Sequence, residues 1–180
     1  LGDGRRDLLD VDADGLPDVM ETDPTNPGSV MKYYLNRGAS LPSVGQGMTG
    51  TTGLYLYNTN VHLLDLDGDG HVELIHMPTI GSYSVYRLEC DPVPAGGSGA
   101  NRVCRWVAWQ ANMPANPDID FTTDAEENRL VDINGDHLID VVRTTGTRME
   151  HWLNLGKYAG GEGKFGHVDS SGWLSDQPIA

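Results

Sequence analysis

Short apolar runs alternate along this chain with acidic, glycine-containing loops, and the alternation recurs three times. The runs "SYSVYRLE" at 82–89, "RWVAWQ" at 105–110 and "LIDVVRTT" at 138–145 are rich in β-branched and aromatic residues. Such residues favour strands over helices. The pattern predicts an all-β protein in which only residues 122–129 resemble a turn of helix.

The three acidic loops share one spacing of oxygen-bearing side chains. In "LLDLDGDGHVELI", residues 63–75, carboxylates stand at positions 1, 3, 5 and 9 of a loop whose position 6 is glycine. The same spacing recurs in "LLDVDADGLPDVM" and "RLVDINGDHLIDVV". We number these segments loop 1 (residues 10–18), loop 2 (65–73) and loop 3 (132–140). Positions 1, 3, 5 and 9 are Asp10, Asp12, Asp14 and Asp18, then Asp65, Asp67, Asp69 and Glu73, then Asp132, Asn134, Asp136 and Asp140.

This spacing predicts calcium sites. Calcium takes about six to eight oxygen ligands, and carboxylates on alternate residues of a tight loop can converge on one ion. Two carboxylates about 4 Å apart repel by roughly 1 kcal/mol even in bulk water, so an empty loop that holds four of them opposes folding. Magnesium fits less well, because it prefers a smaller octahedron and retains its waters. Position 7 would add a backbone carbonyl, from Leu16, His71 and Leu138.

An alternative to calcium remains open for each loop. Aspartate, asparagine and glycine are also the usual turn formers, so each loop can be interpreted as an acidic turn that holds no ion. In loop 3, His137 replaces the glycine of position 6 and Asn134 removes one charge. Loop 3 is still predicted to bind calcium, with weaker binding or a purely structural turn as the alternative. The prediction is two to three calcium ions.

Each loop lies within a longer unit. Units 1 and 3 end in Leu-Asn-x-Gly after two aromatic or histidine residues, at 33–38 and 151–156, whereas unit 2 lacks this ending. Each unit is predicted to contain a strand, the loop, a second strand, a turn and a third strand. The loops begin 55 and 67 positions apart, which suits a four-stranded propeller blade with its connections. The predicted blades cover residues 1–58, 59–125 and 126–180.

These motifs resemble the FG-GAP or VCBS-type repeats of integrin-alpha-like β-propellers. A closer likeness is to propeller segments of bacterial toxin-complex B components and SpvB-type proteins, where calcium-like loops precede strands ending in W-x-N-x-G or Y-x-L-N-x-G phrases. The resemblance covers about residues 1–40, 60–90 and 128–166. It implies calcium binding at the loop residues named above, and a non-catalytic platform for binding and docking within a secreted assembly.

Three units are too few for a closed ring, which has about four to eight blades. We therefore predict an all-β fold of antiparallel β-propeller blades, about three in number, that form a sector of a larger propeller. A smaller sandwich is the alternative. Because open sheet edges invite pairing with further strands, the expected partner is another protein or the remaining blades of the parent chain, with a glycan as an alternative.

Cys90 and Cys104 flank a glycine- and proline-rich stretch between two predicted strands. A long hairpin with a cysteine at each base would allow a disulfide that closes a loop of about 15 residues. The alternative is a pair of thiols in a reducing compartment. Together with the resemblance, the disulfide predicts an extracellular, secreted or cell-surface location.

The net charge of −14 argues against a nucleic-acid or anionic-membrane partner, since both require clustered lysine and arginine. No apolar stretch approaches the roughly 20 residues that cross a bilayer, so membrane insertion is not expected. Nothing at the start resembles a secretory signal. The opening "LGDGRRD" at 1–7 resembles the end of an acidic loop, so the chain is expected to be an excerpt.

Two common catalytic motifs are absent from the sequence, and a third lacks its usual structural context. "GQGMTG" at 45–50 satisfies G-x-G-x-x-G, but no helix is expected after it, so it is interpreted as an inter-blade loop. Neither H-E-x-x-H nor G-x-S-x-G occurs. The protein is therefore expected not to be an enzyme, with a glycosidase-like hydrolase that uses the loop carboxylates as the remaining catalytic alternative.

Two further non-catalytic functions compete with the docking scaffold. Trp106, Trp109 and Trp152 are predicted to pack between blades, with sugar stacking in a carbohydrate-binding or adhesion module as the alternative. A thrombospondin-type-3-like calcium-stabilised spacer needs loops about a dozen residues apart, and only residues 1–18 meet that spacing. The prediction is a calcium-binding scaffold module.

Overall fold

A computed structural model shows eleven strands and no helix among the residues that it describes. The strands form three antiparallel sheets, which confirms the all-β prediction. No helix suited in length and apolarity to a membrane span occurs in this part of the chain. A helical turn was expected near residues 122–129. Residues 122–126 lie outside the described residues, and a strand begins at Asn128. The described residues are 4–23, 25, 30–50, 53–79, 82–92, 102–110, 121, 127–145 and 148–154.

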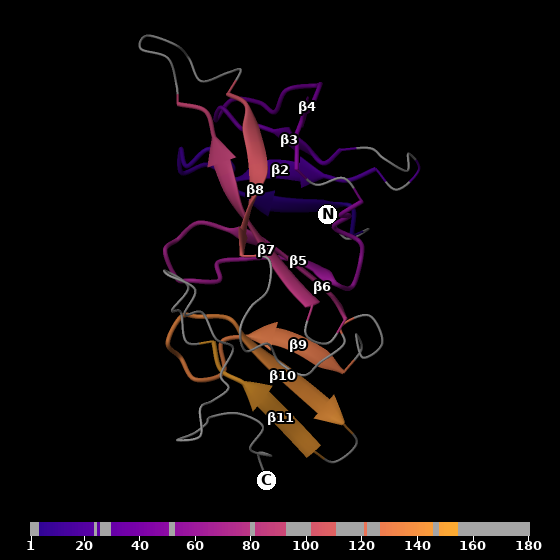
Figure 1. Cartoon of the computed structure of the whole chain (residues 1–180). Coiled ribbons are helices and arrows are strands. Elements are labelled where there is room, and N and C mark those ends of the chain that lie inside the picture. The colour runs from indigo at the N-terminus through magenta and orange to yellow at the C-terminus, as the bar shows by residue number, and fades with distance from the viewer. Residues whose placement is uncertain are drawn as a thin grey trace.

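The three sheets follow one another along the chain and along the long axis of Figure 1. Neighbouring strands within each sheet are also neighbours in sequence, so every sheet is a simple meander. Sheet A contains β1 (Arg6–Leu9), β2 (Asp18–Glu21), β3 (Lys32–Tyr34) and β4 (Gln46–Gly47). Sheet B contains β5 (Val61–Leu64), β6 (Glu73–Thr79), β7 (Ser82–Cys90) and β8 (Cys104–Gln110). Sheet C contains β9 (Asn128–Val131), β10 (Asp140–Thr145) and β11 (Arg148–Trp152).

Each acidic loop connects the first two strands of its sheet, so the predicted order of strand, loop, strand and third strand is observed in all three units. The register is the same each time: position 9 of the loop opens the second strand and pairs with the residue just before position 1. This equivalence makes the three units structural repeats. The exact blade boundaries remain a prediction. The equivalent pairs are Leu9 with Asp18, Leu64 with Glu73, and Val131 with Asp140.

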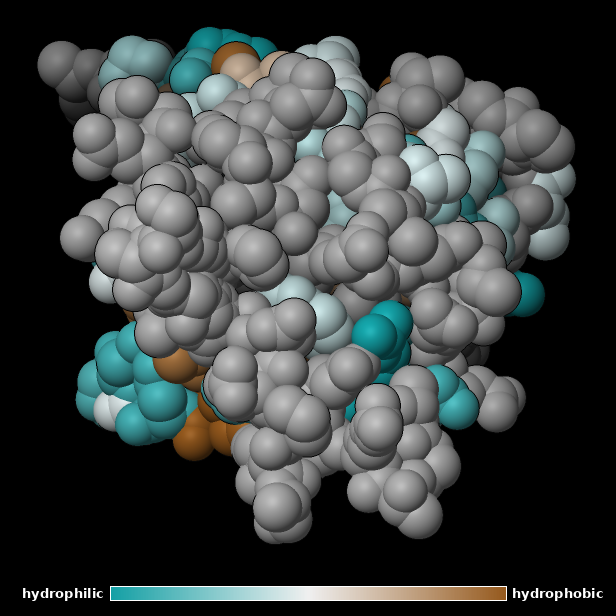
Figure 2. Space-filling model, turned by 60° about the horizontal axis from the view of Figure 1, so that its bottom comes forward, coloured by the Kyte–Doolittle hydropathy of each residue, from teal (hydrophilic) through white to brown (hydrophobic). Residues whose placement is uncertain are grey.

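Two hydrophobic clusters hold the sheets together. One cluster combines buried residues of sheet A with Trp106 of β8, and the other joins sheet B to sheet C through Phe121 and Trp152. Trp106 and Trp152 are each only 3% exposed, which favours packing over sugar stacking for these two rings. Trp109 is partly buried against the second cluster. The described residues that can be seen in Figure 2 are mainly hydrophilic, with a hydrophobic area at the lower left.

The glycine-rich segment 45–50 packs closely between sheets A and B. Its first part contains β4, and the Thr49 carbonyl accepts a hydrogen bond from the Trp106 N–H at 3.1 Å. A Cβ atom at Gly50 would lie 2.2 Å from the Trp106 carbonyl oxygen, and Gly50 has a φ of 92°. Glycine is therefore required here by a close backbone approach and a left-handed conformation. The interpretation as a loop between blades fits this packing better than a phosphate site does.

The disulfide between Cys90 and Cys104 is present and confirms the predicted pairing. The two residues are direct cross-strand partners at the end of the β7–β8 hairpin that adjoins its connecting loop. Cys104 is fully buried, and its N–H donates to the Tyr33 hydroxyl of sheet A at 3.1 Å. The Cys90 sulfur lies 3.2 Å from the carbonyl oxygen of Val11 in loop 1. The cross-link therefore fixes the hairpin where it meets the first acidic loop.

Removing this cross-link is expected to lower the free energy of unfolding by about 3 kcal/mol, because a short closed loop restricts the unfolded chain. Urea denaturation of the double variant Cys90→Ser, Cys104→Ser tests this expectation against the oxidised protein. Reductant should shift the midpoint of the native chain and leave that of the variant unchanged. Equal midpoints for the oxidised protein and the variant would contradict it.

Candidate metal centres

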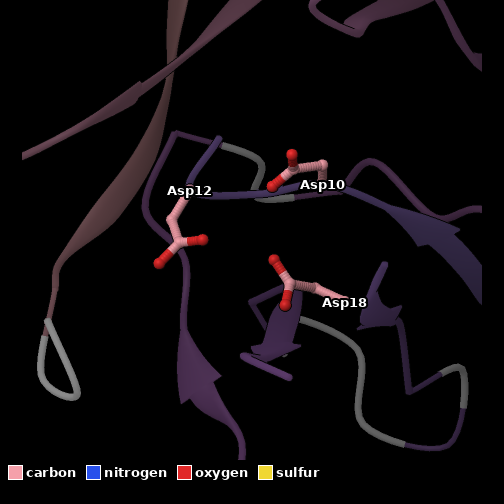
Figure 3. A group of neighbouring side chains, drawn as sticks. All are labelled: Asp10, Asp12 and Asp18. Carbon is pink, nitrogen blue, oxygen red and sulfur yellow. The ribbon is translucent and has the colours of Figure 1, made fainter. Parts of the chain in front are cut away.

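In loops 1 and 2 the structure gathers three carboxylates around one point. The grouped side chains occupy positions 1, 3 and 9, and their oxygen atoms all lie within 4.8 Å of one another. Figure 3 shows the loop 1 carboxylates turned toward a common space from the end of β1 and the start of β2. The position-5 carboxylates lie outside these groups and accept the N–H of position 7 at 2.8–2.9 Å. The two groups are Asp10, Asp12 and Asp18, and Asp65, Asp67 and Glu73.

The backbone of each loop turns sharply at two positions. Positions 4 and 6 have positive φ in all three loops, with values between 58° and 87°. The position-1 carboxylate closes the turn, because it accepts the N–H of position 6 at 2.8–3.0 Å. Glycine adopts positive φ without steric cost, which explains its frequency here. The positive-φ residues are Ala13, Gly15, Gly68, Gly70, Gly135 and His137.

The position-9 carboxylate is buried in every unit, with an exposed fraction of 0 or 1%. One of its oxygens accepts the N–H of position 2, at 2.8 Å in loop 1 and 3.0 Å in loops 2 and 3. This bond ties the start of the loop to the first residue of the second strand. The donors are Val11, Leu66 and Ile133, and the acceptors are Asp18, Glu73 and Asp140.

The same carboxylate also binds the backbone at the Leu-Asn-x-Gly ending of units 1 and 3. The second oxygen of Asp18 accepts the backbone N–H of Asn36, and that of Asp140 accepts the N–H of Asn154, both at 2.6 Å. The third strand of each unit is thereby attached to its loop. Unit 2 lacks the ending, and the other oxygen of Glu73 lies 3.9 Å from the Arg87 Nε instead. The repeated phrase thus has a structural role, because it marks where the third strand is attached to its loop.

Burial sets the protonation preference of these buried groups. It raises the pKa of Glu73 to about 7, and the neighbouring negative charges of Asp67 and Asp69 act in the same direction. Burial likewise raises the pKa of Asp18 and of Asp140, although backbone N–H groups partly offset the effect. A cation beside such a carboxylate favours its ionised form.

The donor chemistry of loop 1 fits a hard cation. The Asp12 side chain is buried, with an exposed fraction of 7% for the residue, and its Oδ1 has no hydrogen-bond partner among the described residues. A buried carboxylate oxygen without a partner is costly, and most such oxygens are satisfied in native proteins. All three converging groups offer oxygen and none offers nitrogen or sulfur, as calcium prefers.

Loop 3 differs from the other two. Its carboxylates do not form a comparable group of three among the described residues. The side-chain amide of Asn134 donates to Asp136 Oδ2 at 2.9 Å, so position 3 satisfies a neighbouring carboxylate rather than adding a charge. His137 adopts a φ of 73° where the other loops have glycine. Loop 3 thus keeps the backbone shape of the other loops with one carboxylate fewer. Calcium at its four predicted ligands remains a prediction, with weaker binding or a structural turn as the alternative.

Exchanging the residue at position 6 should change stability in opposite directions in loops 3 and 2. His137→Gly is expected to raise the free energy of unfolding by about 1 kcal/mol, because non-glycine residues are strained in the left-handed region. Gly70→Ala should lower it by a similar amount, and a Cβ at Gly70 would meet nothing within 4 Å, so no clash contributes. Urea denaturation in chelator measures both. Destabilisation by His137→Gly would show that the imidazole contributes more than its backbone strain removes.

Two arginines that the sequence analysis did not single out lie at loops 1 and 2. The Arg37 Nη1 is 2.9 Å from Asp12 Oδ2 and 2.8 Å from Asp14 Oδ2. Arg87 forms an ion pair with Asp67. Arg37 is the variable residue of a Leu-Asn-x-Gly ending, so the bond between Asn36 and loop 1 places it beside the acidic group. Arg87 lies in β7, and nothing in the local sequence indicated that it would pair with Asp67 of loop 2.

Comparison with known proteins finds a family model that matches the segment containing both centres. Residues 10–76 match the FG-GAP-like repeat. The match runs from position 1 of loop 1 into β6, so the FG-GAP-like segment includes both loops that gather carboxylates, and it covers fewer than half of the 180 residues. Three antiparallel sheets of three or four strands are consistent with a partial propeller-like FG-GAP fold. None of the curated proteins or solved structures matches the chain.

Proposed function

We propose that loops 1 and 2 each bind one calcium ion, and that the ions stabilise a non-catalytic scaffold that docks other proteins. The observation that carries the proposal is the convergence of three carboxylates in each loop, together with the buried Asp12 oxygen that lacks a hydrogen-bond partner among the described residues. FG-GAP-type repeats often bind calcium, and the match to that repeat covers both loops.

The ligand set follows from the geometry and from the spacing. Positions 1, 3 and 9 supply the grouped carboxylates of loops 1 and 2. The carboxylate of position 5 and the carbonyl of position 7 complete the set in the proposal, because calcium needs about six or more oxygens and water can fill what remains. Bound calcium would neutralise the loop and allow its carboxylates to remain ionised together.

The scaffold role is supported by the fold class and by the family of the repeat. FG-GAP-type repeats are typically non-catalytic and generally mediate protein interactions. In the described loops, most carboxylates also accept backbone N–H groups, which suits a structural role better than proton transfer. The proposed partner is another protein or further propeller blades of the same parent chain.

The proposed location is extracellular or cell-surface. The cross-strand disulfide is of the kind that persists in oxidising compartments, and repeats of this type occur in extracellular proteins. Placement within a toxin-complex or SpvB-type assembly remains a prediction, which rests on the likeness of the strand-ending phrases.

Isothermal titration calorimetry of the chelator-treated protein tests the proposal. Calcium should bind at two sites, Asp12→Asn should remove or strongly weaken one, and Asp67→Asn should do the same to the other. Magnesium should bind more weakly at both. A titration without calcium-dependent heat at several temperatures, or one that neither variant alters, would contradict the assignment.

A further inference from the structure

Arg37 and Arg87 occupy equivalent places at the two acidic groups, although their positions in the repeat differ. Arg37 lies three residues beyond β3 and Arg87 lies within β7, and these are the third strands of sheets A and B. Each guanidinium pairs with the position-3 carboxylate of its loop, Asp12 or Asp67. A guanidinium group therefore lies beside the position-3 carboxylate in both loops, although the two arginines occupy different positions in the repeat.

Each arginine also reaches a second carboxylate of its loop. The Arg37 Nη1 lies 2.8 Å from Asp14 Oδ2, and the Arg87 Nε lies 3.9 Å from Glu73 Oε1. The contacted oxygens therefore belong to the residues assigned to calcium. Loop 3 has the uncharged Asn134 at position 3, and its side-chain amide donates to Asp136. In loops 1 and 2, where position 3 is a carboxylate, an arginine pairs with it. In loop 3, where position 3 is the neutral Asn134, its own side-chain amide donates to a neighbouring carboxylate.

We propose that Arg37 and Arg87 are internal counter-ions that compete with calcium for the position-3 carboxylates and so set the calcium affinity of loops 1 and 2. The inference rests on the proposed function. Arginine stays charged at all relevant pH values, so it both occupies ligand oxygens and repels an approaching cation. In the metal-free protein the same charge reduces repulsion among the carboxylates, which lets the loops keep their folded shape.

The exchange of a guanidinium for calcium is sterically open. The side chains of Arg37 and Arg87 are 33% and 39% exposed, so either guanidinium can move into water when calcium takes its oxygen. Asp12 Oδ1, on the other side of the same carboxylate, already lacks a hydrogen-bond partner among the described residues. Calcium can therefore bind first at this oxygen and then displace Arg37 from the other.

Arg87 lies against a tryptophan ring whose fluorescence can report its movement. Its guanidinium carbon lies 3.5 Å from the centroid of the Trp109 ring, which is a cation–π contact. Displacement of Arg87 from Asp67 changes the position of the charge over that ring. Calcium binding at loop 2 is therefore expected to change Trp109 fluorescence, whereas binding at loop 1 should not act through this contact.

Calcium affinities of Arg37→Gln and Arg87→Gln, measured on the full chain by calorimetry, test the proposal. Each variant should bind calcium about five- to tenfold more tightly at its own loop, the range expected when a partly exposed ion pair and its repulsion of calcium are removed. Arg105→Gln is the matched control, because Arg105 pairs with Glu89 and Asp91 outside the loops. Unchanged or weaker binding in both loop variants would overturn the proposal.

Two further measurements separate competition from general effects on folding. Arg87→Lys keeps the charge but loses the planar fork, so its affinity should fall between those of the native protein and Arg87→Gln. The calcium-dependent fluorescence change should disappear in Trp109→Phe and in Arg87→Gln. If no form binds calcium, the proposed function and this inference both fail. If all forms bind calcium with equal affinity, only this inference fails.

Discussion

Replacing Asp18 with alanine is expected to lower the free energy of unfolding by about 3–5 kcal/mol, even in chelator. The carboxylate is fully buried and accepts two backbone N–H groups, from Val11 at 2.8 Å and from Asn36 at 2.6 Å. Alanine leaves both donors buried without an acceptor and detaches the third strand of sheet A from loop 1. Urea denaturation in chelator measures the loss without a contribution from bound calcium.

The matched control for this prediction is Asp7→Ala on the neighbouring strand β1. Asp7 is exposed, and among the described residues its carboxylate accepts only the N–H of the adjacent Leu8. Its replacement should change the free energy of unfolding by less than about 0.5 kcal/mol. Asp140→Ala should behave like Asp18→Ala, because Asp140 accepts the equivalent two N–H groups. A loss below about 1 kcal/mol for Asp18→Ala would mean that the two hydrogen bonds to its carboxylate are not required for stability.

Asp67→Ala is expected to destabilise the protein strongly in calcium and only slightly in chelator. With calcium at about a thousand times its dissociation constant, loss of one ion costs about 4 kcal/mol. For a chain of this size, that corresponds to a fall of roughly 10 °C in melting temperature. In chelator the variant loses the partly exposed pair with Arg87 but also removes repulsion from Glu73, so the net change should be small.

The control for Asp67→Ala is Glu89→Ala, which removes the same charge and also breaks a pair with an arginine. Glu89 lies outside the loops, and its side chain is 52% exposed in contact with Arg105. Its melting temperature should show no dependence on calcium beyond that of the native protein. Equal destabilisation by Asp67→Ala in calcium and in chelator would mean that Asp67 acts through the fold and not through an ion.

Local patterns predicted much of the architecture. The strands, the three loops and the disulfide follow from β-branched runs, turn residues and the placement of Cys90 and Cys104, all of which act over short stretches of chain. The His137 departure was also visible in sequence, and the structure shows the positive φ that a glycine would adopt more easily. These features can be predicted without knowing how the sheets pack against one another.

The contacts between distant segments could not be predicted in the same way. The Leu-Asn-x-Gly phrase was recognised as a repeat, but its role depends on Asn36 reaching across to Asp18, which only the register of β2 and β3 establishes. The pairing of Arg87 with Asp67 depends likewise on the face of β7 that turns toward loop 2. Side-chain orientation across a sheet depends on register, and one residue of slip reverses it.

Thermal unfolding followed by circular dichroism tests the central claim most directly, first in excess chelator and then across a calcium titration, with magnesium in parallel. Two structural calcium sites predict that the melting temperature rises by roughly 10 °C or more as calcium saturates, with a β-type spectrum throughout and a much smaller rise in magnesium. A melting temperature that is the same in chelator, calcium and magnesium would contradict the claim and leave the loops as acidic turns.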